Sequence, residues 1–155
     1  MEKIYRLLYP MRVVLITANN EGKENIMPAA WCYPLSAEPP VFGVAIAKKR
    51  FTYELIHKSK YYAINLASPE MKDGVKICGS KSGREIDKFA LSGWKKEDGK
   101  KVVLIAESPA SIECEVIDEY EIGDHVIFVG KAINIVKRRE EKGLYHRGGD
   151  DFVVV

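Results

Sequence analysis

The two longest strand patterns of the sequence lie next to each other near its C-terminal end, and they constrain the fold more than any other feature. Residues 110–120 alternate apolar and acidic side chains, which is typical of a strand with one face in solvent. Residues 125–136 are apolar on both faces as far as Val129, as expected of a central strand. The intervening residues 121–124 include Gly123 and predict a hairpin.

Shorter strands precede this hairpin, and short helices interrupt them in the middle of the chain. Thr52 is the expected cap of one helix, and Gly79 is the expected end of another. Because strands dominate and do not alternate strictly with helices, we expect a mainly β fold, a closed or split antiparallel β-barrel with short helices. The sequence predicts strands at residues 12–18, 25–33, 41–47 and 61–66, helices at residues 53–59 and 68–78, and a loop at residues 94–101.

Length and composition favour one globular domain, residues 1–155, with neither a membrane nor a nucleic acid as partner. No apolar run approaches the about 20 residues that span a bilayer. Residues 1–10 lack the features of a signal peptide, and we interpret them as part of the mature protein. The formal net charge of +2 is too small to indicate a strongly basic, nucleic-acid-binding protein. Three widely spaced cysteines support neither a disulfide framework nor a metal site, so we expect a reducing cytoplasm.

Two segments carry residue types suited to binding a phosphate, although the sequence has no GxGxxG or P-loop motif. In the first, Lys48, Arg50 and Thr52 stand where a strand leads into a helix, and free N–H groups at a helix start favour anions. In the second, Ser82 is followed by Arg84 and Lys88, which share a face if the turn is helical. The alternatives are a solvated strand end with an ordinary threonine cap and a surface loop with neutralised charges.

A third segment, Pro28-Ala29-Ala30-Trp31, places small residues at the end of a strand. Small side chains let a flat ligand lie against the backbone, whose N–H and C=O groups can then bind the polar edge of a ring. The alternative is a strand end that carries a core tryptophan. Taken alone, this segment favours the second interpretation.

Together these segments resemble the flavin-reductase-like (flavoredoxin-type) family over nearly the whole chain, from about residue 12 to 152. The resemblance depends on the order and spacing of several segments rather than on any one of them. They are residues 25–31, the Pro39-Pro40 pair, residues 48–56, 63–66 and 82–89, and Gly123-Asp124-His125.

The resemblance implies an FMN-binding split β-barrel of Greek-key type that forms a homodimer with the flavin near the subunit interface. It implies that Lys48, Arg50 and Thr52 hold the FMN phosphate and that Ser82, Arg84 and Lys88 close on the phosphate or the ribityl chain. The ribityl chain and ring would lie along Pro28, Ala29, Ala30, Trp31, Cys32 and Asn65. His125 would face the ring as the catalytic residue, or orient a strand instead. Residues 145–152 resemble a segment that borders the flavin pocket.

The function implied is an FMN-dependent oxidoreductase in which NAD(P)H reduces a flavin, or ferric iron through bound FMN. One alternative is an FMN-containing electron-transfer protein, supplied by a protein donor and without a nicotinamide site of its own. Another is a split barrel that binds no flavin. The sequence has no recognisable nicotinamide-binding motif, so it does not distinguish NADH, NADPH and a protein as the electron donor.

Overall fold

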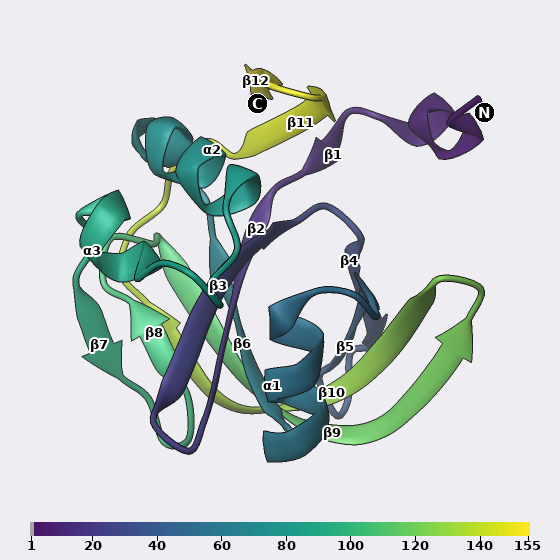
Figure 1. The fold of residues 1–155 in the computed structure, drawn as a ribbon, viewed down its shortest axis with the longest axis vertical. Coiled ribbons are helices and arrows are strands. Elements are labelled where there is room, and N and C mark those ends of the chain that lie inside the picture. The colour runs from purple at the N-terminus through teal and green to yellow at the C-terminus, as the bar shows by residue number, and fades with distance from the viewer. Residues whose placement is uncertain (1) are drawn as a thin grey trace.

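A seven-stranded antiparallel sheet forms the centre of the protein in a computed structural model that describes residues 2–155 (Figure 1). Its strand order is β3-β2-β6-β9-β10-β5-β4. These strands are β2 (Val14–Asn20), β3 (Lys23–Ala29), β4 (Cys32–Ser36), β5 (Val41–Ala47), β6 (Tyr61–Leu66), β9 (Ala110–Ile122) and β10 (His125–Lys137). The predicted hairpin is β9–β10, in which His125 pairs with Ile122.

The sheet curls around helix α1 (Phe51–Ser59), which packs against β2, β3 and β5 (Figure 1). Leu55 and Ile56 of α1 join a buried core with Ile16, Val44 and Phe128 from the surrounding strands. The mainly β prediction is confirmed. The hydrogen-bonded strand order is open, however, because β3 and β4 form its two edges within residues 2–155, so a closed barrel is not confirmed.

A second buried core joins the outer face of β2 to short helices and to the C-terminal strands. It includes Val13, Leu15, Met71, Val75 and Phe89. The helices are η1 (Ile4–Leu8), η2 (Pro69–Met71), α2 (Lys72–Ser80) and α3 (Lys88–Ser92), and the remaining strands are β1 (Met11–Arg12), β7 (Lys96–Asp98), β8 (Val103–Ile105), β11 (Leu144–Gly148) and β12 (Asp151–Val154). No helix among residues 2–155 is both long and apolar enough to span a bilayer.

Two predicted helix boundaries are wrong, and both corrections concern residues near the site described below. Arg50 rather than Thr52 occupies the N-cap position of α1, because the Thr52 side chain points inward and is fully buried. Gly79 lies within α2, which continues to Ser80. At α1, a tertiary contact of Thr52, the hydrogen bond that its hydroxyl accepts from Asn25, overrides local capping propensity.

Two further differences concern the strands. Residues 94–101 were expected to be a loop but contain β7, which pairs with β8. The buried Glu113 carboxylate accepts hydrogen bonds from the N–H groups of Lys100 and Val102, each at 2.8 Å, and so holds the turn between them. The strand predicted at residues 25–33 divides into β3 and β4 with a break at residues 30–31, where the Trp31 carbonyl accepts from the Ala45 N–H at 2.9 Å.

Candidate functional site

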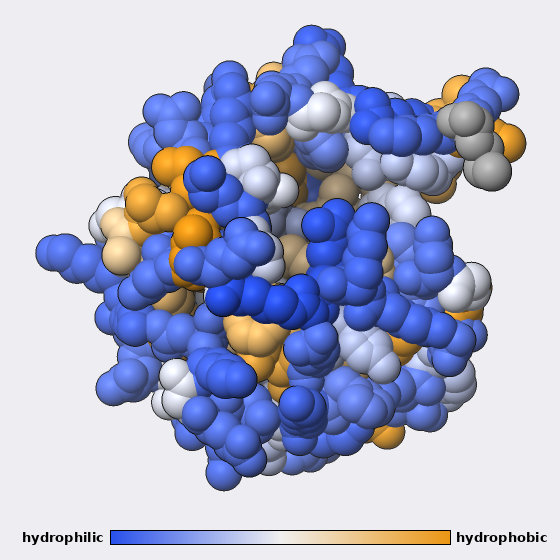
Figure 2. Space-filling view, viewed as in Figure 1, coloured by the Kyte–Doolittle hydropathy of each residue, from blue (hydrophilic) through white to orange (hydrophobic). Residues whose placement is uncertain are grey.

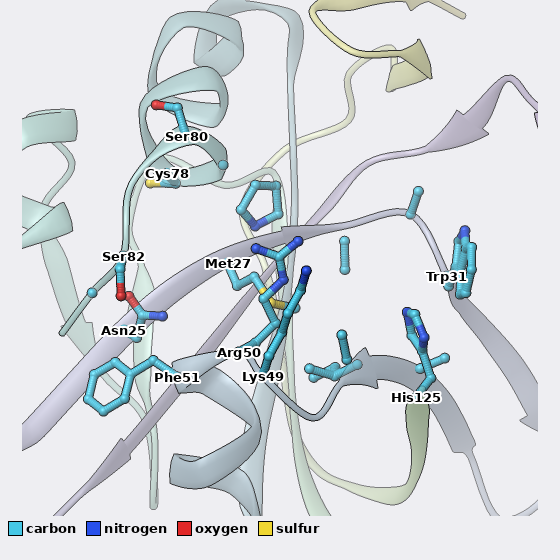
Figure 3. A pocket seen from close by; sticks show the side chains of 18 of the residues that line it. Asn25, Met27, Trp31, Lys49, Arg50, Phe51, Cys78, Ser80, Ser82 and His125 are labelled. Carbon is cyan, nitrogen blue, oxygen red and sulfur yellow. The ribbon is translucent and has the colours of Figure 1, made fainter. Parts of the chain in front are cut away.

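A cavity of about 840 Å³ opens where several chain segments converge. On the face shown in Figure 2, hydrophilic side chains surround a central hollow. The residues that line the cavity come from the ends of β3 and β5, the first turn of α1, the end of α2 with its following loop, the start of β10, and the two terminal regions. Figure 3 shows Trp31 and His125 on one side of it, Asn25 and Ser82 on the opposite side, and Lys49 and Arg50 between them.

Cationic side chains form a basic side of the cavity, defined here by Lys49, Arg50, Lys81, Arg84 and Lys88. Within the described chain, no side chain caps the N-terminus of α1. The free N–H groups and the helix dipole therefore favour an anion there. Arg84 ties the loop after α2 to α1, since its Nη2 atom lies 2.5 Å from the Glu54 carboxylate and its guanidinium lies 5.3 Å from the centre of the Phe51 ring.

Lys88 is the deepest of these cations and is buried. Its ammonium group donates to the carbonyl oxygens of Ile26 and Cys78, each at 2.8 Å, so it fastens β3 to the end of α2. Burial lowers the pKa of Lys88 and raises the pKa of the Cys78 thiol to about 11. Cys78 is therefore a neutral thiol near pH 7 rather than a nucleophilic thiolate.

An amide side chain lies beside the basic side and is incompletely hydrogen-bonded. Asn25 is 4% exposed, and its Nδ2 donates to the Thr52 hydroxyl at 2.9 Å. The buried Oδ1 atom has no hydrogen-bond partner among residues 2–155. This atom lies against Gly83, where an added Cβ would overlap it. The glycine therefore allows the loop after α2 to lie directly on Asn25.

Rings form the opposite, aromatic side of the cavity, defined here by Tyr9, Trp31, His125 and His146. The Trp31 and His125 rings are stacked, with centroids 4.6 Å apart and planes inclined by 27°. Trp31 Nε1 donates to the Tyr9 hydroxyl at 3.1 Å, and the Tyr9 ring meets His146 edge-on at 5.4 Å. His125 Nδ1 lies 2.6 Å from Asp124 Oδ1, and this hydrogen bond lowers the pKa of Asp124.

Most of the site residues expected from the sequence line this one cavity, although they are scattered along the chain. Sequence reasoning did not single out Asn25, Lys49 or Tyr9 as binding residues. Asn25 and Lys49 lie within segments that carried the family resemblance, and no sequence signal indicated Tyr9. The expected residues that line the cavity are Pro28, Ala29, Ala30, Trp31, Arg50, Ser82, Arg84, Lys88 and His125. His146, from the C-terminal segment expected to border a pocket, lines it as well.

Two of the expected residues lie outside the cavity because their side chains have protein partners elsewhere. Lys48 forms an ion pair with Glu121 on β9. Asn65 is fully buried, and its amide donates to Leu15 and Thr17 and accepts from Ile105 and Ser111. The Asn65 side chain therefore connects neighbouring strands of the sheet and leaves no surface for a ligand.

The other two lie close behind the cavity wall. Thr52 is fully buried, and its hydroxyl accepts a hydrogen bond from the lining residue Asn25. Cys32 packs against the core around α1, and burial raises the pKa of its thiol to about 12. Cys32 therefore has the environment of a small hydrophobic side chain.

Comparison with known proteins gives consistent matches along the chain. A family model described as "Flavin reductase like domain" matches residues 5–152. An uncharacterized protein of Pyrococcus abyssi is 41% identical over 138 residues, which cover 88% of this chain and 79% of that protein.

Two solved structures are also similar. An FMN-binding protein from Thermus thermophilus superposes with a TM-score of 0.90 at 28% identity, covering 99% of this chain and 91% of that one. Flavoredoxin from Methanosarcina acetivorans superposes with a TM-score of 0.88 at 28% identity, covering 96% and 86%.

Proposed function

Because the chain belongs to the flavin reductase-like family, we propose that it is an oxidoreductase that binds FMN in the cavity and uses NAD(P)H to reduce a flavin, or ferric iron through the bound FMN. The observation that carries this proposal is the division of the cavity into a basic side and an aromatic side. FMN has the matching shape, with an anionic phosphate at one end and a flat ring at the other. The three free cysteines of the described chain support a reducing, cytoplasmic setting.

The residues present fit this cofactor. The uncapped N-terminus of α1, together with Arg50 and Lys49, suits the phosphate. Ser82 and Arg84 on the loop after α2 would close over the phosphate or ribityl chain. Ala29 and Ala30 leave the backbone beside Trp31 accessible to a ring. The volume of about 840 Å³ lies within the ordinary range of small-molecule sites.

Bound FMN would supply the redox chemistry, and the protein would orient the ring and its partners. His125 is the proposed catalytic residue because it lines the aromatic side and has a fixed orientation. Its Nδ1 atom is engaged by Asp124, so Nε2 is the nitrogen free to donate or accept a proton. Stacking on Trp31 further restricts the imidazole ring.

A second candidate function is electron transfer without a nicotinamide site. The likeness to flavoredoxin at 28% identity supports it, and the cavity suits FMN equally well in either case. In that function the electrons would come from a protein donor that docks at the aromatic side. The two candidates differ in one property, which is whether a reduced nicotinamide nucleotide reduces the bound flavin.

We also propose a homodimer, because apolar side chains of η1 project into solvent. Ile4, Leu7 and Leu8 are 67%, 84% and 75% exposed, and the N-terminal segment extends away from the sheet (Figure 1). Tyr5 on the same helix lines the cavity. A second copy that covered η1 would therefore also border the cavity.

The absorbance spectrum of the purified protein tests the cofactor and the donor together. Absorbance bands at about 370 and 450 nm, present at purification or after titration with FMN, are expected of bound oxidised flavin. Anaerobic NADH or NADPH should then bleach them. Bleaching only by a protein donor or dithionite would favour the electron-transfer function, and no flavin binding at all would contradict both.

Arg50→Ala should weaken FMN binding by about 1.5–3 kcal/mol, because it removes a cation from the basic side. Lys48→Ala is the matched control, since this neighbouring cation pairs with Glu121 outside the cavity. Its FMN affinity should stay within about 0.5 kcal/mol of the wild type. Isothermal titration checks both variants, and an equal loss in the two would contradict the assignment of the basic side.

His125→Ala should slow reduction of bound FMN by NAD(P)H by about 100-fold, the lower range of general acid–base catalysis. FMN affinity should change much less, because the imidazole lies on the aromatic side of the cavity, opposite the cations proposed to hold the phosphate. Stopped-flow absorbance measures the reduction rate and a binding titration measures affinity. An unchanged rate would show that His125 only orients the start of β10.

Sedimentation equilibrium should give twice the 17.5 kDa mass of the chain. Leu7→Asp should shift the protein toward the monomer, because a charge in an apolar interface is desolvated without a partner. The exposed Lys58→Asp variant, on the far part of α1, controls for the change in charge. A wild-type monomer at micromolar concentration would refute the dimer.

A further inference from the structure

The Asn25 side chain has an unused hydrogen-bonding atom that the proposed residue roles do not explain. It is almost fully buried, it lines the cavity, and its Oδ1 atom lacks a partner within the described chain. Buried polar groups are almost always hydrogen-bonded, so an exception beside a cavity points to a ligand that completes the bonding.

A second observation at the same place indicates what kind of ligand this is. The N-terminus of α1 has no side-chain cap in the part of the chain described here, and Arg50 and Phe51 bring that terminus to the cavity wall. Its free N–H groups favour an anion. Four cations of the basic side, Lys49, Arg50, Arg84 and Lys88, line the same cavity, so the ligand group expected beside Asn25 is anionic.

The bond between Asn25 and Thr52 permits the amide to serve such an anion. At present Nδ2 donates to the Thr52 hydroxyl at 2.9 Å. A hydroxyl both donates and accepts, so a half-turn of the amide replaces this bond by one from the Thr52 hydroxyl to Oδ1. The half-turn also brings the NH₂ group to the position beside Gly83 now held by Oδ1.

We propose that Asn25 selects for a phosphorylated ligand: when a phosphate monoester binds at the N-terminus of α1, the Asn25 amide turns over on the Thr52 hydroxyl and donates to the phosphate. The inference rests on the proposed function in that FMN is the expected monoester. It assigns Thr52 an indirect role, since this buried hydroxyl would position Asn25 rather than contact the ligand. Gly83 lets the loop after α2 approach Asn25 closely enough for Ser82 and Arg84 to meet the same group.

Titration of two variants with FMN and with riboflavin tests this role, because the two flavins differ only in the phosphate. Asn25→Ala removes the donor without adding charge, and it should raise the Kd for FMN about tenfold or more while the Kd for riboflavin stays within about twofold. Asn25→Asp keeps an acceptor for Thr52 but places a carboxylate beside the phosphate, so the loss of FMN affinity should be larger still. Equal losses for both flavins, or no loss in Asn25→Ala, would overturn the proposal.

Two further measurements keep the proposal separate from folding and from the identity of the cofactor. If either Asn25 variant fails to fold, Thr52→Val tests the same link, and it should weaken FMN but not riboflavin. If the wild type binds neither flavin, the proposed function fails, and inorganic phosphate then tests Asn25 alone. Phosphate at matched ionic strength should raise the Tm of the wild type more than that of Asn25→Ala, and an equal rise would overturn the assignment.

Discussion

The packing of α1 inside the curled sheet is the constraint on which the rest of the structure depends. Leu55 and Ile56 fix one face of this helix against strands from both halves of the sheet. The buried face sets the rotation of the helix, and that rotation brings Arg50 and Phe51 to the cavity. The position of Arg50 on the basic side of the cavity therefore depends on the burial of apolar side chains several residues further along the helix.

Sequence patterns predicted those elements whose signals are local. The strand at residues 61–66 matches β6, because a short run with aromatic and β-branched residues is typical of a strand. The β7 strand could not be predicted, because its turn is held by Glu113, a residue of β9 that is not part of the local pattern. The capping role assigned to Thr52 was wrong because its side chain points inward, where its hydroxyl accepts a hydrogen bond from Asn25 on β3. In both failures, a contact with a residue of another element overrode local preference.

The candidate site was predictable as a set of segments but not side chain by side chain. Lys48 and Lys49 are chemically identical neighbours in a turn, yet Lys48 pairs with Glu121 and Lys49 lines the cavity. No pattern in the sequence decides which of the two turns inward, because a turn has no fixed side-chain period. Asn65 was expected to contact a ligand, but its amide instead forms hydrogen bonds within the sheet, with Leu15 and Ser111. Residue type and spacing identified the wall of the cavity, and only the fold assigned individual roles.

The aromatic side draws on both terminal regions, since Tyr9 meets His146. These two rings stand far apart along the chain, so the wall that they form cannot exist until segments from both of these regions have folded together. A ligand that requires this wall would bind the folded protein and not its partly folded forms. Such a ligand would stabilise the protein against unfolding rather than guide the first steps of its folding.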